Sequence, residues 1–122
     1  MVTYKSAYQQ AQLWLQAMQR VDSTDPQLGT LLEVNLRGLQ QLQPLLQADE
    51  TADQASESFI AQAQPLQTEI NKQLRLLETD LIFLKAARQP ATLQQRHQQI
   101  QTRLTLLLRY CEAILVLCIT PE

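Results

Sequence analysis

The hydrophobic positions of this chain recur at alternating spacings of four and three residues along most of its length. Such spacing places apolar side chains on one face of a helix, which turns about every 3.6 residues. The pattern breaks at turn-forming residues, and it predicts four helices, at about residues 3–21, 26–47, 51–88 and 91–119. No stretch alternates polar and apolar residues as a half-buried strand would. The expected fold class is all-α.

The first two predicted helices each carry a continuous apolar stripe. In the first it consists of Tyr4, Tyr8, Ala11, Leu15 and Met18, widened by Ala7 and Trp14. In the second it consists of Leu28, Leu32, Asn35, Leu39, Leu42 and Leu46, widened by Leu31, Leu36 and Leu45. Between them, Asp25 is expected to cap the second helix, with Pro26 at its first position. Asn35 either fixes the register of the stripe or lies at its edge, and Pro44 is expected to kink only the last turn.

The third predicted helix is the longest and contains a proline. Residues 48–58, which are acidic and poor in apolar side chains, are interpreted as a loop that passes into its first turns. The stripe that follows consists of Phe59, Ala63, Leu66, Ile70, Leu74, Leu77, Leu81 and Leu84. At Pro65 either the helix kinks or a new helix begins, and the unbroken phase of the stripe favours a kink. The helix is expected to end before Pro90.

The fourth predicted helix completes a single domain, residues 1–122. Its stripe consists of Leu93, His97, Ile100, Leu104, Leu107, Cys111, Ile114 and Cys118. The two cysteines lie about 10 Å apart along one helix, too far for a disulfide within it, so we interpret them as buried, reduced thiols. Short connections make successive long helices antiparallel. The predicted architecture is therefore an antiparallel up-down-up-down four-helix bundle.

Charge and hydropathy narrow the classes of function. The formal net charge of −2 argues against general nucleic-acid binding, which requires a basic surface. The charge is uneven, with 3 basic and 7 acidic residues in 1–68 but 7 basic and 5 acidic residues in 69–122. The most apolar stretch, residues 104–119, is shorter than the roughly 20 residues that span a bilayer. With no apolar signal segment at the N-terminus, a cytoplasmic location without a membrane span is expected.

The sequence contains few residues that could bind a metal ion or a phosphate group or act in catalysis. His97 is the one histidine, it lies on an apolar stripe, and a metal site needs several clustered ligands. Gly29 and Gly38 are isolated and form no phosphate-binding loop. Neither cysteine lies near a histidine in sequence, so no nucleophile and base pair is indicated. The acidic residues are expected in the loop or on outer faces, and the chain is predicted to be no enzyme and to bind no cofactor.

Basic residues flank the predicted turn between the third and fourth helices. Lys85, Arg88 and Arg96 lie nearest to it, and further from it lie Lys72, Arg75, Arg103 and Arg109. They are either ordinary charged surface or a patch that binds an acidic segment of another protein. RNA or DNA is less favoured because aromatic residues are not interleaved with the basic ones. We select Lys85, Arg88 and Arg96 as candidate partner-binding residues.

Three stretches, residues 68–77, 83–92 and 109–115, resemble the cyanobacterial PatD family of heterocyst frequency control proteins. The resemblance covers residues 68–115 well and residues 21–67 hardly at all. It implies a developmental regulator that limits how many cells become nitrogen-fixing heterocysts. It also implies direct contact with the division protein FtsZ, and it brings no catalytic residue or cofactor.

Two other functions remain open from the sequence. The many leucines on the second and fourth helices are also compatible with a self-associating structural or adaptor module, in which an exposed leucine stripe closes a homodimer. A ligand carrier with a pocket between the helices is the third alternative, although no residue pattern specifically motivates it.

Overall fold

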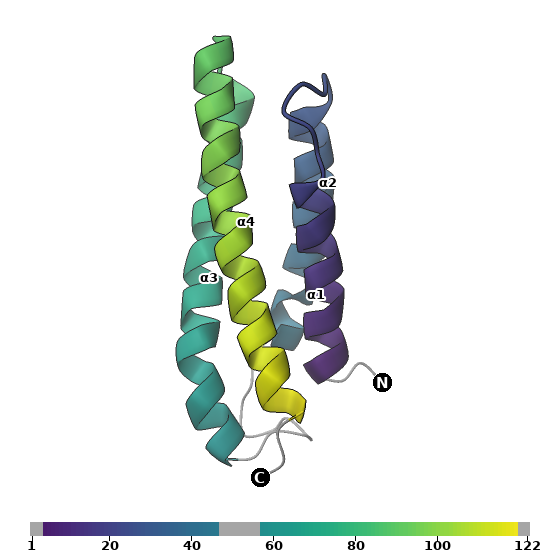
Figure 1. The fold of residues 1–122 in the computed structure, drawn as a ribbon, viewed down its shortest axis with the longest axis vertical. Helices are drawn as coiled ribbons and strands as arrows, with labels where there is room; N and C mark the ends of the chain where they lie inside the picture. Colours follow the sequence, from purple (N-terminus) through teal and green to yellow (C-terminus); the bar gives the residue numbers. More distant parts are fainter. Residues whose placement is uncertain (1–3, 47–56, 120–122) are drawn as a thin grey trace.

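The computed structural model describes residues 4–46 and 57–119, which are almost entirely helical (Figure 1). The elements are α1 (Tyr4–Gln19), α2 (Leu28–Leu42), the 3₁₀ helix η1 (Gln43–Leu46), α3 (Glu57–Ala86) and α4 (Pro90–Ile119). No strand occurs within these two described segments. The predicted all-α class and the four predicted helices are therefore confirmed.

The core consists almost entirely of the predicted stripes. Its buried apolar residues are Ala7, Tyr8, Ala11, Leu15, Met18, Leu28, Leu32, Leu36, Leu39, Leu46, Ala63, Ile70, Leu74, Leu77, Leu81, Leu84, Ile100, Leu104, Leu107, Cys111 and Ile114. Leu45, expected to widen the second stripe, is instead 43% exposed. Leu46 is the residue of η1 that enters the core, and adjacent side chains of a helix point about 100–120° apart, so Leu45 faces away from it.

Two boundaries of α2 differ from the prediction. The helix begins at Leu28, and the Asp25 carboxylate accepts a hydrogen bond of 2.8 Å from the Gln27 amide, so Asp25 stabilises a preceding turn and is not the N-cap. At the other end the α-helix stops at Leu42, where residues up to 47 were expected to be helical. Pro44 has no amide hydrogen for a helical bond, and the Gln43 amide donates to the Gln40 carbonyl in a tighter turn.

α3 is continuous through Pro65, so the interpretation that a new helix begins there is wrong. The helix ends at Ala86, two residues before the expected end, and α4 begins at Pro90. The predicted start of the third helix at residue 51 lies outside the described residues, as does most of the predicted loop at 48–58.

The helices pack in pairs. α3 and α4 form a long hairpin, α1 packs on both α2 and α4, and the α1–α2 and α3–α4 connections lie at the same end of the molecule (Figure 1). Polar contacts join α2 and η1 to α3: Glu33 to Lys85, Gln40 to Glu78 at 2.6 Å, and Gln43 to Asn71 at 3.2 Å. As the residue numbers rise along α2 and η1, the residue numbers of their contact partners on α3 fall.

η1 is fixed to the core through one carbonyl group. The Leu46 carbonyl oxygen accepts hydrogen bonds from the Tyr8 hydroxyl at 2.7 Å and from the Gln67 amide nitrogen at 2.9 Å. All three residues are buried. The Tyr8 hydroxyl of α1 and the Gln67 amide nitrogen of α3 are therefore satisfied by the backbone of η1.

α1 and α2 are in close contact at Gly38. A Cβ atom at this position would lie 2.6, 2.7 and 2.9 Å from three ring atoms of Trp14. The indole therefore occupies the space that a side chain at position 38 would need.

Nowhere in the described part of the chain is a helix both long and apolar enough to traverse a bilayer.

Candidate partner-binding surface

Lys85, in the last turn of α3, is engaged by α2. Its ammonium lies 2.5 Å from a carboxylate oxygen of Glu33, which also pairs with Arg37 at 3.1 Å. The hydrogen bond from Lys85 holds the pKa of Glu33 below its ordinary value of 4.5. Because the folded pKa is the lower one, the stabilising contribution of Glu33 is present above pH 4.5 and is lost as the pH falls through the folded pKa.

Arg96, in the second turn of α4, lies over the ring of Phe83 on α3. The guanidinium carbon is 4.7 Å from the ring centroid, within the range of a cation–π contact. Phe83 is 48% exposed, and Arg96 is half-buried. The pair therefore presents an aromatic ring and a delocalised cation to solvent.

Arg88, in the connection between α3 and α4, is exposed and forms no ion pair with any described residue. The three predicted residues thus share one end of the molecule but have different neighbours. Lys85 is bound by Glu33, Arg96 lies on Phe83, and Arg88 is available to solvent. We use the name turn surface for Phe83, Arg88 and Arg96.

A hollow of about 490 Å³ lies beside the turn surface. The start of α2 and the connection before it form one wall of the hollow. The C-terminal end of α3 and the N-terminal end of α4 form the other wall. Its lining residues are Ser23, Thr24, Asp25, Pro26, Leu28, Gly29, Thr30, Leu84, Lys85, Ala87 and Leu93. The lining contains hydroxyl groups, the Asp25 carboxylate, which accepts the hydrogen bond from the Gln27 amide, and Lys85, which is paired with Glu33.

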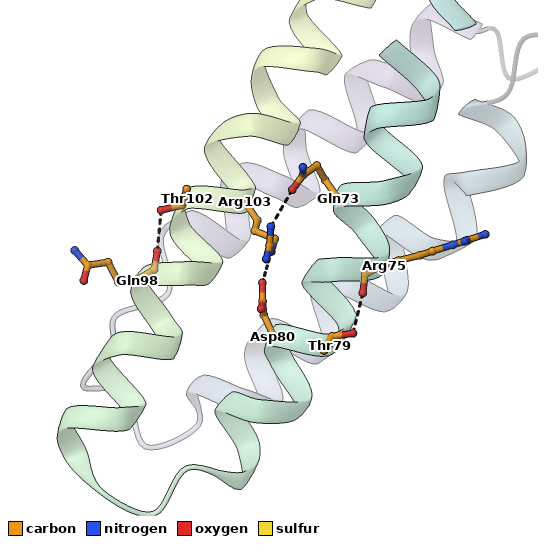
Figure 2. A network of polar contacts seen from close by, with 7 residues as sticks. All are labelled: Gln73, Arg75, Thr79, Asp80, Gln98, Thr102 and Arg103. Atoms are coloured by element: carbon orange, nitrogen blue, oxygen red, sulfur yellow. Dashed lines mark hydrogen bonds and ion pairs between the residues drawn. The ribbon is translucent and has the colours of Figure 1, made fainter. Parts of the chain in front are cut away.

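A buried ion pair joins α3 to α4 (Figure 2). The Asp80 carboxylate accepts a hydrogen bond from the Arg103 guanidinium, which also donates to the Gln73 side-chain oxygen at 3.3 Å. The side chains of Asp80 and Arg103 are 8% and 18% exposed. Acidic residues were expected on outer faces or in the loop, and for Asp80 that expectation is wrong.

The sequence contains the signal for this ion pair. Asp80 follows Leu77 by three residues, and Arg103 follows Ile100 by three, so each charge lies on the face that its helix buries. A carboxylate on one buried face and a guanidinium on the next satisfy one another. The pair holds the hairpin together and leaves neither group available to a partner.

The structure offers little to a metal ion. Among the described residues, no three His, Cys, Asp or Glu side chains lie together as a metal-binding group. A ring nitrogen of the half-buried His97 lies 3.3 Å from the Val21 carbonyl oxygen, so the imidazole bridges α4 and the connection that follows α1. His97 therefore has a structural neighbour at the edge of the core.

Both cysteines are free thiols. Cys111 is buried, and its burial raises the pKa of the thiol from 9.0 to about 12. Cys118 is half-buried, and burial raises its pKa as well. Since the thiolate is the reactive form, both thiols are less reactive than an exposed cysteine, and Cys111 is the more protected.

Thiol labelling of the native protein at pH 8 is expected to modify Cys118 well before Cys111, because burial limits access and disfavours the thiolate. Mass spectrometry of the Cys111→Ala and Cys118→Ala variants, each of which retains one thiol, assigns each labelling rate to its cysteine. Equal labelling rates at the two sites would contradict the burial of Cys111.

Burial of Cys111 also makes stability depend on pH. Above pH 9 the Cys111 thiol ionises in the unfolded chain but not in the folded one, so the free energy of unfolding is expected to fall between pH 9 and about 12.

The fold and this surface define a small all-helical protein with a packed core and a solvent-facing basic and aromatic end. The chain belongs to the family described as the CRR41 C-terminal domain, whose model matches residues 38–109, more than half of the chain. The match extends from the middle of α2 into the second half of α4 and includes the turn surface. Neither the curated proteins nor the solved structures give a match.

Proposed function

We propose that this protein is a non-enzymatic regulator that acts by binding another protein, and that its partner is the division protein FtsZ. In this proposal it modulates FtsZ assembly in the cytoplasm and thereby sets the frequency of heterocyst differentiation. The resemblance of residues 68–77, 83–92 and 109–115 to the PatD family supports the choice of partner.

One observation carries the proposal of a binding role. Phe83 is 48% exposed with Arg96 at 4.7 Å above its ring, on the side where Arg88 has no ion pair among the described residues. Aromatic residues and arginine are enriched in protein interfaces relative to the rest of the protein surface. Here they lie together and face solvent at one end of the molecule.

The proposal includes a specific architecture, an antiparallel up-down-up-down bundle with a kink in α3 near Pro65. Contacts from α2 and η1 to α3 supply one argument, because Glu33, Gln40 and Gln43 pair with successively lower residues of α3. Contacts between α3 and α4 supply another, since Phe83 meets Arg96 and Asp80 meets Arg103. A proline inside a helix removes one backbone hydrogen bond, which favours bending at Pro65.

Co-sedimentation with FtsZ polymers tests the choice of partner. The wild-type chain is expected in the pellet with polymers formed in GTP. The double variant Arg88→Glu/Arg96→Glu is expected to bind at least about tenfold more weakly, because both charges of the turn surface are reversed. Circular dichroism checks that its helical content is unchanged.

The matched control is Lys5→Glu/Arg109→Glu, which reverses two exposed charges away from the turn surface. It is expected to bind as the wild type does. A wild-type chain that stays in the supernatant would remove FtsZ as the partner. Equal losses in the two double variants would show that net charge, and not the turn surface, determines binding.

Self-association is the second candidate function. Among the described residues, the exposed large apolar side chains are spread over five elements, with two of them adjacent on α3: Leu13, Val34, Leu45, Ile82, Phe83 and Val116. Scattered apolar residues of this kind are ordinary on a monomer, so this function ranks second. Analytical ultracentrifugation at high concentration separates the two, since a homodimer would favour the self-associating module.

A further inference from the structure

The solvent-facing side of α3 carries a regular stripe of its own. Its members, Thr68, Lys72, Arg75, Thr79, Ile82, Phe83 and Ala86, are all exposed. From Thr68 to Ile82 they recur at spacings of four and three residues, as positions along a helix–helix seam do. We use the name α3 face for these seven residues, of which Phe83 is partly covered by Arg96 of α4.

The α3 face is positively charged although the chain has a net charge of −2. Neither Lys72 nor Arg75 forms an ion pair with a described residue. No carboxylate belongs to the stripe, and Glu69, three residues before Lys72, is half-buried. Beside the stripe, Glu78 accepts a hydrogen bond from Gln40. The two cations of the α3 face therefore lack an internal counter-charge.

The other half of the α3 face is apolar. Ile82 is 66% exposed, the highest value among the large apolar side chains described, and the adjacent Phe83 is 48% exposed. A groove of about 200 Å³ between α2 and α3 runs beside Ile82, and Leu36 and Leu81 are its other apolar lining residues. The rest of its lining is polar or charged: Glu33, Arg37, Gln40, Glu78 and Lys85. Apolar surface at one end of the stripe and free cations at the other give the α3 face a polarity along its length.

We infer that the α3 face docks an acidic amphipathic helix of the partner protein. Lys72 and Arg75 would pair with carboxylates of that helix, and Ile82 and Phe83 would cover its apolar residues, with Thr79 between the two contacts. From Lys72 to Phe83 the face extends about 16 Å, which is three turns of a docked helix. The inference rests on the proposed function and specifies the chemistry of the partner segment.

Charge decides between an acidic helix and a second copy of this chain. In a two-fold dimer each α3 face would meet the same face of the other copy. With the two copies of α3 parallel, Lys72 and Arg75 would lie against the same two cations, and like charges at an interface repel. With the two copies antiparallel, they would lie against Ile82 and Phe83 of the other copy and would be buried without a counter-charge. An acidic segment instead gains charge-assisted hydrogen bonds with both cations.

Fluorescence anisotropy with a designed peptide tests the inference on the full chain. The probe is a labelled acidic amphipathic helix of about 20 residues, long enough to hold helical structure. A matched probe carries lysine in place of every glutamate. The acidic probe is expected to bind at least about tenfold more tightly than the basic one, and its affinity is expected to fall as salt is raised.

Two pairs of variants locate the contact. Lys72→Glu/Arg75→Glu and Ile82→Ser/Phe83→Ser are each expected to weaken binding of the acidic probe at least about tenfold. Their controls, Lys5→Glu/Arg109→Glu and Leu13→Ser/Val34→Ser, change the same residue classes at exposed positions elsewhere and are expected to bind as the wild type does. Equal binding of the two probes, or equal losses in variants and controls, would overturn the inference.

The same variants in FtsZ co-sedimentation separate this inference from the proposed function. Probe binding that depends on the α3 face, together with no sedimentation with FtsZ, would leave the docking surface standing and remove FtsZ as the partner. Sedimentation with FtsZ that is unaffected by Lys72→Glu/Arg75→Glu would overturn the inference and leave the proposed function in place.

Discussion

Replacing Asp80 with alanine is expected to lower the free energy of unfolding by about 3 kcal/mol, because the change leaves the Arg103 guanidinium largely buried without its carboxylate. The expected cost lies at the lower end for a broken buried pair, since 18% of the Arg103 side chain reaches solvent. Gln73 retains one hydrogen bond to Arg103 but carries no charge. Urea denaturation followed by circular dichroism measures the change.

The double variant Asp80→Leu/Arg103→Met is the informative comparison. Replacing both partners with apolar residues removes the charge and its desolvation penalty together, so stability is expected to return close to the wild-type value. Glu112→Ala serves as the exposed control, because its carboxylate on α4 accepts a hydrogen bond from Gln12 in solvent, and it is expected to cost less than about 0.5 kcal/mol. A double variant as unstable as Asp80→Ala would contradict this account of the pair.

Replacing Gly38 with alanine is expected to destabilise the protein by about 1–3 kcal/mol through overpacking. The added methyl group would lie under 3 Å from three atoms of the Trp14 ring, which is rigid and must move. Alanine is a better helix former than glycine by about 1 kcal/mol, so a net loss of stability would show that packing outweighs propensity. Thermal and urea unfolding measure the effect.

Gly29→Ala is the matched control for this prediction. Its methyl group would lie 3.1 Å from Cγ of Lys85, a flexible side chain that is able to shift. This variant is expected to be as stable as the wild type or slightly more stable. Trp14→Leu is expected to relieve the clash of Gly38→Ala, so that the double variant loses less stability than the sum of the single changes. Equal stabilities of Gly38→Ala and Gly29→Ala would refute the close packing at position 38.

Periodicity predicted the core well because burial depends on the helical face on which a residue lies. Every residue on the predicted stripe of α4 from Ile100 to Ile114 is buried. The same reasoning failed at Leu45 in η1, which is exposed while the adjacent Leu46 is buried. Periodicity therefore located the apolar core within the regular helices, but it did not predict which side chain of the short η1 segment enters the core.

The contacts between side chains of different helices could not be predicted from the sequence pattern. Lys85 was predicted to flank the turn, which it does, but its pairing with Glu33 depends on the packing of α2 beside α3. Asp80 was assigned to the solvent because acidic residues are rarely buried without a partner, and its partner, Arg103, is on another helix. The contact between Arg96 and Phe83 likewise follows from the register of α3 and α4.

FtsZ assembly followed by light scattering, with and without an equal molar amount of this protein, tests the central claim most directly. The account predicts a clear change in polymer mass or bundling with the wild type and a much smaller change with Arg88→Glu/Arg96→Glu. Lys5→Glu/Arg109→Glu should act as the wild type does. Scattering traces that are identical with and without the folded, helical protein would contradict the proposal that it regulates FtsZ by contact.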